Sequence, residues 1–359
     1  MTERAESLPG HRQRLAHACK RAGILPALTG LRGMVRRDLR ILAYHRVLDD
    51  ARLDGFDFDP DLVSATEADF RWQMRMVARH MSPVRFADVI AHIEGGPRLP
   101  KRALLVTFDD GYDDNYHVAF PVLRELGVPA TFFVSTGHVD SGMPFEYDWL
   151  VHMVRNAPPG EVRLEAGPEG GALSFDVPSA VDARLAVAGG LLARMKEIPA
   201  LEQAALVARL AALWGMPPRP HPQCRPMTWD QLREMDAAGM EIGSHGVHHR
   251  MLAKLPRDEM AWELQESAKR LSAELGHAAL SVAYPVGGPD AYDDAVVDAA
   301  RASGFKAGCS YISGTSQAAH GNRFELRRIP VERHVDRHWF EAVLALPELF
   351  MHPTPLPRD

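Results

Sequence analysis

Short apolar runs alternate with helix-like stretches along most of this chain of 359 residues, and this alternation strongly limits its possible folds. The runs are rich in β-branched and aromatic residues, as in Ala130–Val134, which is typical of buried strands. Repeated strand–helix units imply parallel strands with helices outside them. Six or seven such units predict an α/β barrel, closed or incomplete. The predicted strands are 41–45, 104–108, 130–134, 240–244, 280–284, 306–311 and 328–331, and the predicted helices include 67–80, 228–238, 257–275, 293–303 and 339–346.

The alternation is interrupted between about residues 138 and 225. Residues 181–214 are rich in Ala and Leu at helical spacing, and Pro-rich stretches flank them. We interpret this segment as a mostly helical subdomain or lid inserted into the barrel. The predicted organisation is a basic extension at 1–39, a barrel at 40–347 with the insertion at about 138–225, and a tail at 348–359.

Charge and cysteine content argue against several classes of protein. The net charge of -6 gives no indication of nucleic-acid binding. The 3 cysteines are scattered without a CxxC pair, which favours reduced thiols over a disulfide framework or a thiolate metal site. No apolar run approaches the roughly 20 residues that span a bilayer, and the N-terminus lacks the apolar core of a signal peptide. We therefore expect a cytoplasmic protein.

The N-terminal extension is basic although the whole chain is acidic. One interpretation is a partly helical segment that packs on the barrel. The other is a segment that lies on an anionic membrane surface, giving peripheral membrane contact. Its apolar side chains for that contact would be Leu15, Ile24, Leu25, Leu28 and Leu31.

Two polar motifs follow two of the predicted strands. Asp109 and Asp110 directly follow the run 103–108. Adjacent carboxylates repel each other unless a cation offsets their charge. The sequence Asp-Asp-Gly is, however, also common in turns. His245 and His249 follow the run 239–243, where an HxxxH pair could also be a plain surface feature. One aspartate and two histidines are a suitable donor set for a Zn²⁺-type ion with an open position, which leaves the other aspartate as a base.

Both motifs are expected at one rim of the barrel. Catalytic residues of such barrels lie on the loops at the carboxyl ends of the strands. His45 and the turn 285–288 follow predicted strands too, so their side chains and backbone are expected at the same rim. His248 lies beside His249 and is an alternative ligand.

With these motifs the chain resembles the polysaccharide deacetylases, the NodB-homology group of carbohydrate esterase family 4. Residues 107–111 are similar to the first family motif, and residues 244–249 are similar to the second, His-Ser/Thr-x-x-His. The opening at 42–47 and the basic N-terminus resemble the bacterial exopolysaccharide branch. The resemblance covers roughly residues 40–345 without most of the insertion. It implies a distorted (β/α)₇ barrel and metal-dependent removal of N- or O-acetyl groups from sugars.

The resemblance also implies residue roles. Asp109 would be the general base, and Asp110, His245 and His249 would hold one divalent ion, with Zn²⁺ first and Co²⁺ or Ni²⁺ as alternatives. The third motif corresponds loosely to residues 283–287, which makes the backbone N–H of Val286 the oxyanion donor.

Three departures from the family pattern stand out. Gly246 occupies a position where the family usually has Ser or Thr, so a hydrogen bond that braces this loop would be missing. His248 occupies another position where Ser or Thr is common, so it could support the ligands or replace one of them. Ala283 replaces the arginine that orients the base, and Arg328 is the candidate to replace it.

The general acid must protonate the leaving amine, so a histidine is the natural choice. His334 is the first candidate, followed by His45 and His338. Sugar clefts usually present exposed aromatic rings, and the substrate-binding candidates are Tyr112, Tyr147, Trp149, Tyr284 and His45.

The expected function is hydrolysis of acetyl groups, N-linked in the first place, from an amino-sugar saccharide or polysaccharide in exopolysaccharide biosynthesis. One alternative is a hydrolase of a non-sugar amide on the same barrel. Another is a catalytically inactive saccharide-binding homologue. The presence of all four site residues argues against this alternative: Asp109, Asp110, His245 and His249.

Overall fold

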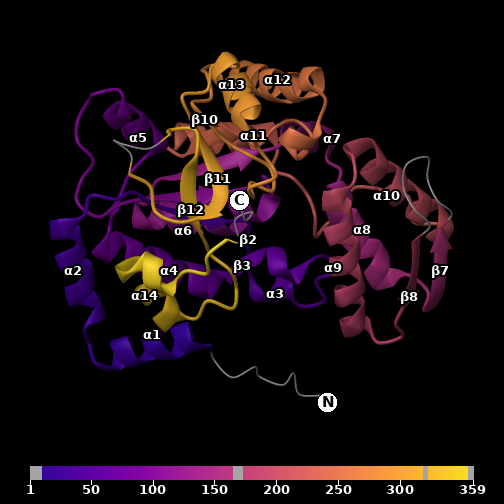
Figure 1. Cartoon of the computed structure of the whole chain (residues 1–359), viewed down its shortest axis with the longest axis horizontal. Coiled ribbons are helices and arrows are strands. Elements are labelled where there is room, and N and C mark those ends of the chain that lie inside the picture. Colours follow the sequence, from indigo (N-terminus) through magenta and orange to yellow (C-terminus); the bar gives the residue numbers. More distant parts are fainter. Residues whose placement is uncertain (1–9, 165–172, 318–321, 355–359) are drawn as a thin grey trace.

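The computed structural model describes residues 10–164, 173–317 and 322–354. Seven parallel strands close into a barrel, because β1 hydrogen-bonds to both β5 and β12 (Figure 1). Around the barrel the strands follow chain order, which confirms the predicted (β/α)₇ class. They are β1 (Arg40–Tyr44), β5 (Ala103–Phe108), β6 (Ala130–Val134), β9 (Glu241–Ser244), β10 (Ser281–Ala283), β11 (Ala307–Ser313) and β12 (Leu326–Pro330).

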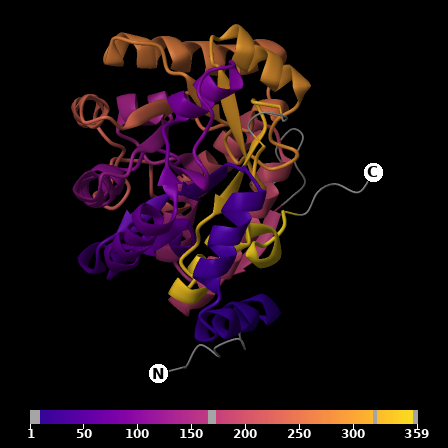
Figure 2. The same ribbon diagram turned by 90° about the vertical axis from the view of Figure 1, so that its left-hand side faces the viewer.

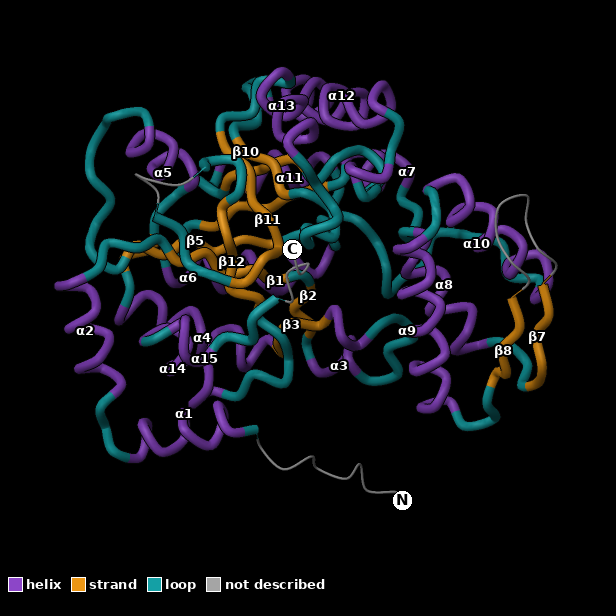
Figure 3. Tube along the Cα trace, viewed as in Figure 1, coloured by secondary structure: helices purple, strands orange, loops and turns teal. Residues whose placement is uncertain are grey.

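Helices cover the outside of the barrel, as Figure 3 shows for the purple segments around the orange strands. Helix α4 begins at the Thr66 cap, whose hydroxyl accepts from the backbone N–H of Asp69, and α11 begins with a capping box at Thr228. All residues of β5 are buried, as expected of a parallel strand covered on both faces. Outside the insertion and the N-terminal extension, the helices from residue 67 onward are α4 (Glu67–His80), α5 (Phe86–Ile93), η2 (Asn115–Ala119), α6 (Phe120–Leu126), α7 (Thr136–Ser141), α11 (Trp229–Ala237), η3 (Leu252–Lys254), α12 (Arg257–Leu275), α13 (Asp294–Ala302), α14 (Arg337–Ala345) and α15 (Pro347–Phe350).

The stretch of chain between β1 and β5 forms a small second sheet. It contains a parallel pair, β2 with β3, that the sequence did not predict, and β4 adds an edge to β5 outside the closed barrel. The elements are β2 (Arg46–Leu48), α3 (Asp50–Leu53), η1 (Pro60–Leu62), β3 (Val63–Thr66) and β4 (Ser82–Pro83).

The insertion forms a helical unit beside the barrel, at the right of Figure 1. Besides three helices it contains an antiparallel hairpin, β7 with β8, which the sequence did not predict. Its apolar cluster is continuous with Leu48, Phe58 and Tyr112 from the barrel side, so it packs on the barrel directly. Its elements are α8 (Glu146–Asn156), β7 (Gly160–Leu164), β8 (Leu173–Val177), α9 (Val181–Glu197) and α10 (Ala200–Trp214).

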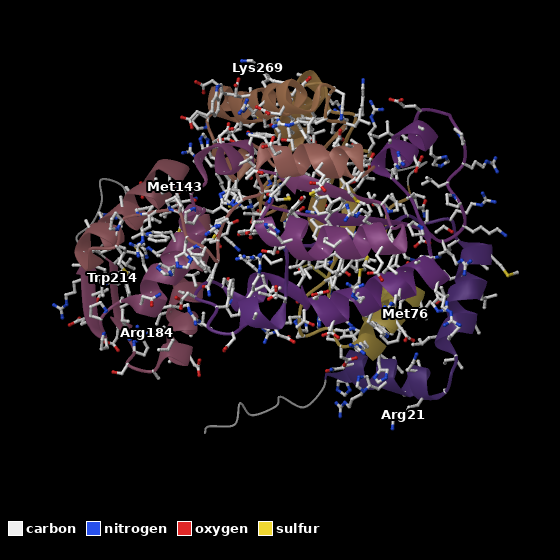
Figure 4. All side chains as sticks on the ribbon, turned by 180° about the vertical axis from the view of Figure 1, so that it is seen from behind. Arg21, Met76, Met143, Arg184, Trp214 and Lys269 are labelled. Carbon is white, nitrogen blue, oxygen red and sulfur yellow. The ribbon has the colours of Figure 1, made fainter. Side chains whose placement is uncertain are left out.

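One buried arginine holds the parts of this insertion together. The guanidinium of Arg184, labelled in Figure 4, donates to the carbonyls of Arg155 and Ala157 at the end of α8 and of Pro178 before α9. These bonds satisfy carbonyls at the end of α8 that the helix itself leaves unpaired.

The N-terminal extension is helical and packs on the barrel through α14 (Figure 2). It consists of α1 (His11–Arg21) and α2 (Leu25–Val35). Lys20 pairs with Glu341 of α14, and Arg32 bridges Asp38 and Glu348, so this extension and α15 hold one another against the barrel. Among residues 10–164, 173–317 and 322–354, no helix combines the length and apolar character that crossing a bilayer requires.

Candidate active site

Three side chains converge at the carboxyl ends of β5 and β9. Oδ1 of Asp110 lies 3.4 Å from Nε2 of His245 and 3.2 Å from Nε2 of His249. One ligand atom from each of the three residues lies within 4.8 Å of the others. The two motifs are more than a hundred residues apart in the chain, and the barrel brings them together as expected of strand ends at one rim.

The hydrogen bonding of this triad fits a divalent ion. Nδ1 of His245 lies 2.8 Å from the carbonyl oxygen of Ala283, so this nitrogen carries the proton and Nε2 presents a lone pair. Oδ1 of Asp110 is buried and accepts no hydrogen bond that satisfies normal geometry from the described residues. A buried acceptor facing two imidazole nitrogens is the donor set and arrangement that a Zn²⁺-type ion requires.

Charges around Asp110 keep it ionised. Burial raises the pKa of this carboxyl, but His249 and His245 outweigh burial and hold the pKa well below its usual value. An ionised carboxylate is the form that binds a cation.

Asp109 is held by a buried arginine. Nη1 and Nη2 of Arg328 donate to Oδ1 and Oδ2 of Asp109, each at 2.7 Å, and the Arg328 side chain is 0% exposed. Burial raises the pKa of Asp109, but the charge of Arg328 outweighs it and lowers the pKa below the usual value. Arg328 of β12 thus pairs with the carboxylate beside which it is expected from the sequence, in place of an arginine at position 283 in β10.

Glu263 of α12 holds the loop that carries the two histidines. Its Oε2 accepts from the backbone N–H of Val247 at 2.7 Å and of His248 at 2.9 Å, and its Oε1 lies 2.8 Å from Nδ1 of His248. Gly246 has φ 76°, and a Cβ there would lie 3.2 Å from Oε2 of Glu263. The loop is thus braced from outside the motif, and His248 contacts this carboxylate.

Backbone strain concentrates at this site. Among the described residues, four that are not glycine have positive φ, and three of them are Asp110 (77°), His249 (56°) and Val286 (63°). Each such conformation costs on the order of 1–3 kcal/mol, which the surrounding fold has to offset. All three residues line the same cavity.

A cavity of about 470 Å³ opens over the triad and Asp109. Its floor includes His45, Tyr284, Val286 and Tyr311 from the barrel rim. The insertion contributes one wall, with Phe145 and Tyr147 at the start of α8 and Leu192, Met195 and Lys196 from α9. The rings of Phe145 and Tyr147 lie 5.1 Å and 5.0 Å from the ring of His249, so the insertion reaches the triad.

The structure places two predicted substrate residues elsewhere. Tyr112 and Trp149 are buried in the apolar cluster of the insertion, where Tyr112 donates to Asp148 at 2.8 Å and Trp149 donates to the carbonyl of Met216. A hydrogen-bond partner for the polar group allows such an aromatic residue to be buried. Neither Tyr112 nor Trp149 is among the residues that line the cavity. Tyr147 and Tyr284 do line it.

The leading candidate for the general acid also lies away from the cavity. The side chain of His334 is 56% exposed, pairs with Glu332 and contacts Trp339. The ring of His338 lies against His17 of α1. Of the three predicted histidines, all within the described chain, His45 is the one that lines the cavity.

Sequence reasoning missed His138, which follows β6 at the same rim and also lines the cavity. Its ring stacks on Phe145 with centroids 3.9 Å apart. Burial lowers the pKa of His138 to about 3, so it is neutral near pH 7. Its position after a strand was the available signal, but only the packing of Phe145 brings it to the cavity wall.

Comparison with known proteins agrees with this geometry. The polysaccharide deacetylase family model matches residues 96–308, more than half of the chain. Poly-β-1,6-N-acetyl-D-glucosamine N-deacetylase of Staphylococcus aureus is 28% identical over 104 residues, 27% of this chain and 36% of that protein. The protein of the same name from Staphylococcus epidermidis is 32% identical over 107 residues, 28% of this chain and 37% of that protein. The matched segment thus spans little more than a third of either relative.

Solved structures share the fold at low identity. The Streptococcus pyogenes deacetylase PplD, solved with acetate, has a TM-score of 0.55 and 18% identity, covering 88% of this chain and 99% of that one. IcaB from Ammonifex degensii has a TM-score of 0.51 and 19% identity, covering 86% and 97%. The family match, supported by this shared fold, shows that the chain belongs to the polysaccharide deacetylase family.

Proposed function

We propose that this protein is a metal-dependent hydrolase that removes N-acetyl groups from an amino-sugar polysaccharide and releases acetate. The observation that carries the proposal is a carboxylate base, Asp109, beside the Asp110–His245–His249 triad at the floor of one cavity. The names of the staphylococcal relatives support a polymer of β-1,6-linked N-acetylglucosamine as the first substrate to test.

Each residue at this site has a separate proposed role in the reaction. A divalent ion held by Asp110, His245 and His249 would polarise the amide carbonyl and lower the pKa of a water molecule. Asp109 accepts the proton of the attacking water, and the two bonds from Arg328 keep its carboxylate ionised and fixed in orientation. The backbone N–H of Val286, a residue that lines the cavity, would stabilise negative charge on the former carbonyl oxygen.

His45 is our candidate for the general acid. Its imidazole lines the cavity, and its ring centroid lies 5.4 Å from that of Tyr311. Imidazole can protonate a leaving amine near neutral pH. The aromatic rings of Phe145, Tyr147 and Tyr311 give the cavity the mixture of apolar faces and few polar groups that suits an acetylated sugar.

The test is acetate release from β-1,6-linked N-acetylglucosamine oligomers by protein stripped with a chelator and then reloaded with Zn²⁺ or Co²⁺. We expect release only after reloading, and we expect Asp109→Asn to lower kcat by about 10²–10⁴-fold, the usual contribution of a general base. Asp140→Asn is the matched control, because Asp140 is a surface carboxylate paired with Arg270.

Two outcomes would overturn the proposal in different ways. Undiminished release by Asp109→Asn would remove Asp109 from the chemistry. Absence of release from these oligomers and from other N-acetylated saccharides, with the metal bound, would favour the non-sugar amide hydrolase or an inactive saccharide-binding protein. Binding of the oligomers without release would identify the latter.

We also propose that the N-terminal helices contact an anionic membrane surface. Leu31, Met34 and Val35 lie at i, i+3 and i+4 on α2 and are 59%, 73% and 76% exposed. Arg21, the last residue of α1, and Arg37, shortly after α2, are exposed as well. Clustered apolar side chains with neighbouring cations are complementary to an anionic lipid surface.

Vesicle sedimentation checks this contact. We expect the protein to bind vesicles of phosphatidylglycerol more strongly than vesicles of phosphatidylcholine, with binding weakened by salt because cations contribute. The variant Leu31→Ser/Met34→Ser/Val35→Ser should lose most of the binding, whereas Leu213→Ser, on an exposed leucine of α10, should keep it. Equal binding by the two variants would exclude α2 as the contact.

A further inference from the structure

We propose that Asp57, His152 and His221 form a second divalent-metal site, which ties the insertion to the barrel. One ligand atom from each of these residues lies within 4.8 Å of the others. The three share no residue with the Asp110 triad, and the proposal does not depend on the deacetylase activity. Two imidazoles and one carboxylate suit Zn²⁺ and related ions, with remaining positions open to water.

The surroundings of the cluster are those of a built site. His152 is nearly buried, its ring stacked on Phe58 with centroids 5.2 Å apart and tilted against Trp149 at 4.6 Å. The ring of His221 lies 5.0 Å from that of His152. An apolar shell around converging ligands strengthens metal binding because it limits competition from water.

The three side chains converge without bonding to one another. Within the described part of the chain, the side chains of Asp57, His152 and His221 make no hydrogen bonds with one another, although their ligand atoms are close together. Nδ1 of His221 accepts a hydrogen bond from the backbone N–H of Gln223 at 3.2 Å. Nδ1 of His152 lies 3.4 Å from the side-chain amide nitrogen of Asn156. Both contacts involve Nδ1, and Nε2 of each ring makes no hydrogen bond with the described residues.

Coordination through Nε2 places the ring proton on Nδ1. Nδ1 of each ring instead faces an N–H donor, Gln223 at His221 and Asn156 at His152, so ion uptake has to replace both contacts. The corresponding nitrogen of His245 already has a carbonyl partner at 2.8 Å. We therefore expect the second site to bind more weakly than the Asp110 triad.

The position of the cluster indicates what the ion would do. Asp57 lies in the loop after α3 on the barrel side, His152 lies in α8 where the insertion begins, and His221 lies on the return to α11. Figures 1 and 3 show α3 between the barrel and α8–α9. Gln223 already joins these segments, because its side chain accepts from the Asp57 N–H and donates to the Gly55 carbonyl, both at 3.0 Å.

An ion here would fix the wall of the catalytic cavity. The insertion that it ties down supplies Phe145, Tyr147 and Met195 to that wall. Closing the chain at both the entry and the exit of the insertion limits how far this wall can move.

A third group of the same residue types provides a contrast. His17, Asp336 and His338 also converge, but Nε2 of His17 lies 2.8 Å from Asp336 and Gln13 donates to the same carboxylate oxygen at 2.7 Å. These hydrogen bonds already satisfy the carboxylate. We expect no ion there, and His17→Gln is the matched control.

The test counts Zn²⁺ bound to chelator-stripped, full-length protein after gel filtration, by elemental analysis. We expect two ions in the wild type, one in Asp110→Asn, one in His221→Gln and none in the double variant, with His17→Gln unchanged at two. In the Asp110→Asn background, saturating Zn²⁺ should raise Tm by about 4 °C or more, and adding His221→Gln should abolish this rise.

The result that overturns the proposal is a single ion in the wild type, or a count that His221→Gln leaves unchanged. If His221→Gln misfolds, as judged by circular dichroism, Asp57→Asn replaces it and carries the same expected count. A failed deacetylase assay leaves the count at this site unaffected, so the two proposals fail separately.

Discussion

Replacing Arg328 by Met is expected to be one of the two most damaging single changes in this protein. Arg328 is fully buried and makes two hydrogen bonds to Asp109, so its removal leaves a buried carboxylate without its counterion. Breaking a buried pair from one side costs about 3–5 kcal/mol of unfolding free energy. We expect urea unfolding to show a loss of this size and acetate release to fall by about 10²-fold or more, because the base loses its orientation.

Companion variants separate positioning from stability. Arg327→Met, on the neighbouring exposed arginine of β12, should change neither quantity. Arg328→Met/Asp109→Asn should recover much of the lost stability, because no unpaired charge remains, but none of the activity. If Arg328→Met alone were as stable and active as the wild type, the pairing with Asp109 would have no role. Arg328→Lys keeps the charge without the two-pronged geometry, so partial activity is expected.

The second large effect is expected from Asp110→Asn. The amide offers a weaker ligand in place of the carboxylate that both His245 and His249 face, so the triad should lose its ion. Polarisation by a metal is worth several kcal/mol in the transition state, which corresponds to a loss on the order of 10³-fold in kcat.

Elemental analysis and acetate release measure this effect together. The apoprotein of Asp110→Asn should unfold near the temperature of wild-type apoprotein, since the buried negative charge is replaced by a neutral group of the same shape. Asp113→Asn, on a carboxylate that contacts Arg52 outside the triad, is the control and should retain the ion. Full activity in Asp110→Asn would contradict the assignment of this triad as the catalytic metal site.

The local sequence pattern was sufficient to predict several of the helices and strands that surround the site. The helices predicted near 67–80 and 257–275 coincide with α4 and α12, and the strand predicted at 130–134 coincides with β6. Helical spacing, strand-like runs and caps are properties of neighbouring residues, so they can be read along the chain. The hairpin β7–β8 was missed because its residues are mostly exposed and lack a buried apolar run.

Burial and distant contacts could not be read in this way. Trp149 is a residue type that often binds sugars, but its side chain belongs to the buried apolar cluster of the insertion. His334 follows the last strand at the expected place, but its side chain points to solvent and to Glu332. Whether a side chain faces a cavity, a core or solvent depends on what packs against it from elsewhere in the chain.

The sequence by itself determined the barrel class, the rim on which the chemistry lies, and the four residues Asp109, Asp110, His245 and His249. The barrel class and the rim follow from periodicity and from the rule that parallel strands present their carboxyl ends at one edge. The four candidate residues follow from the chemistry of their donor atoms and from the resemblance to the family motifs. Only the tertiary structure decided that Arg328 pairs with Asp109 across 219 residues of chain, that the insertion forms a wall of the cavity, and that Asp57, His152 and His221 meet. The reason is physical: these contacts depend on strand closure and helix packing, which no local pattern encodes.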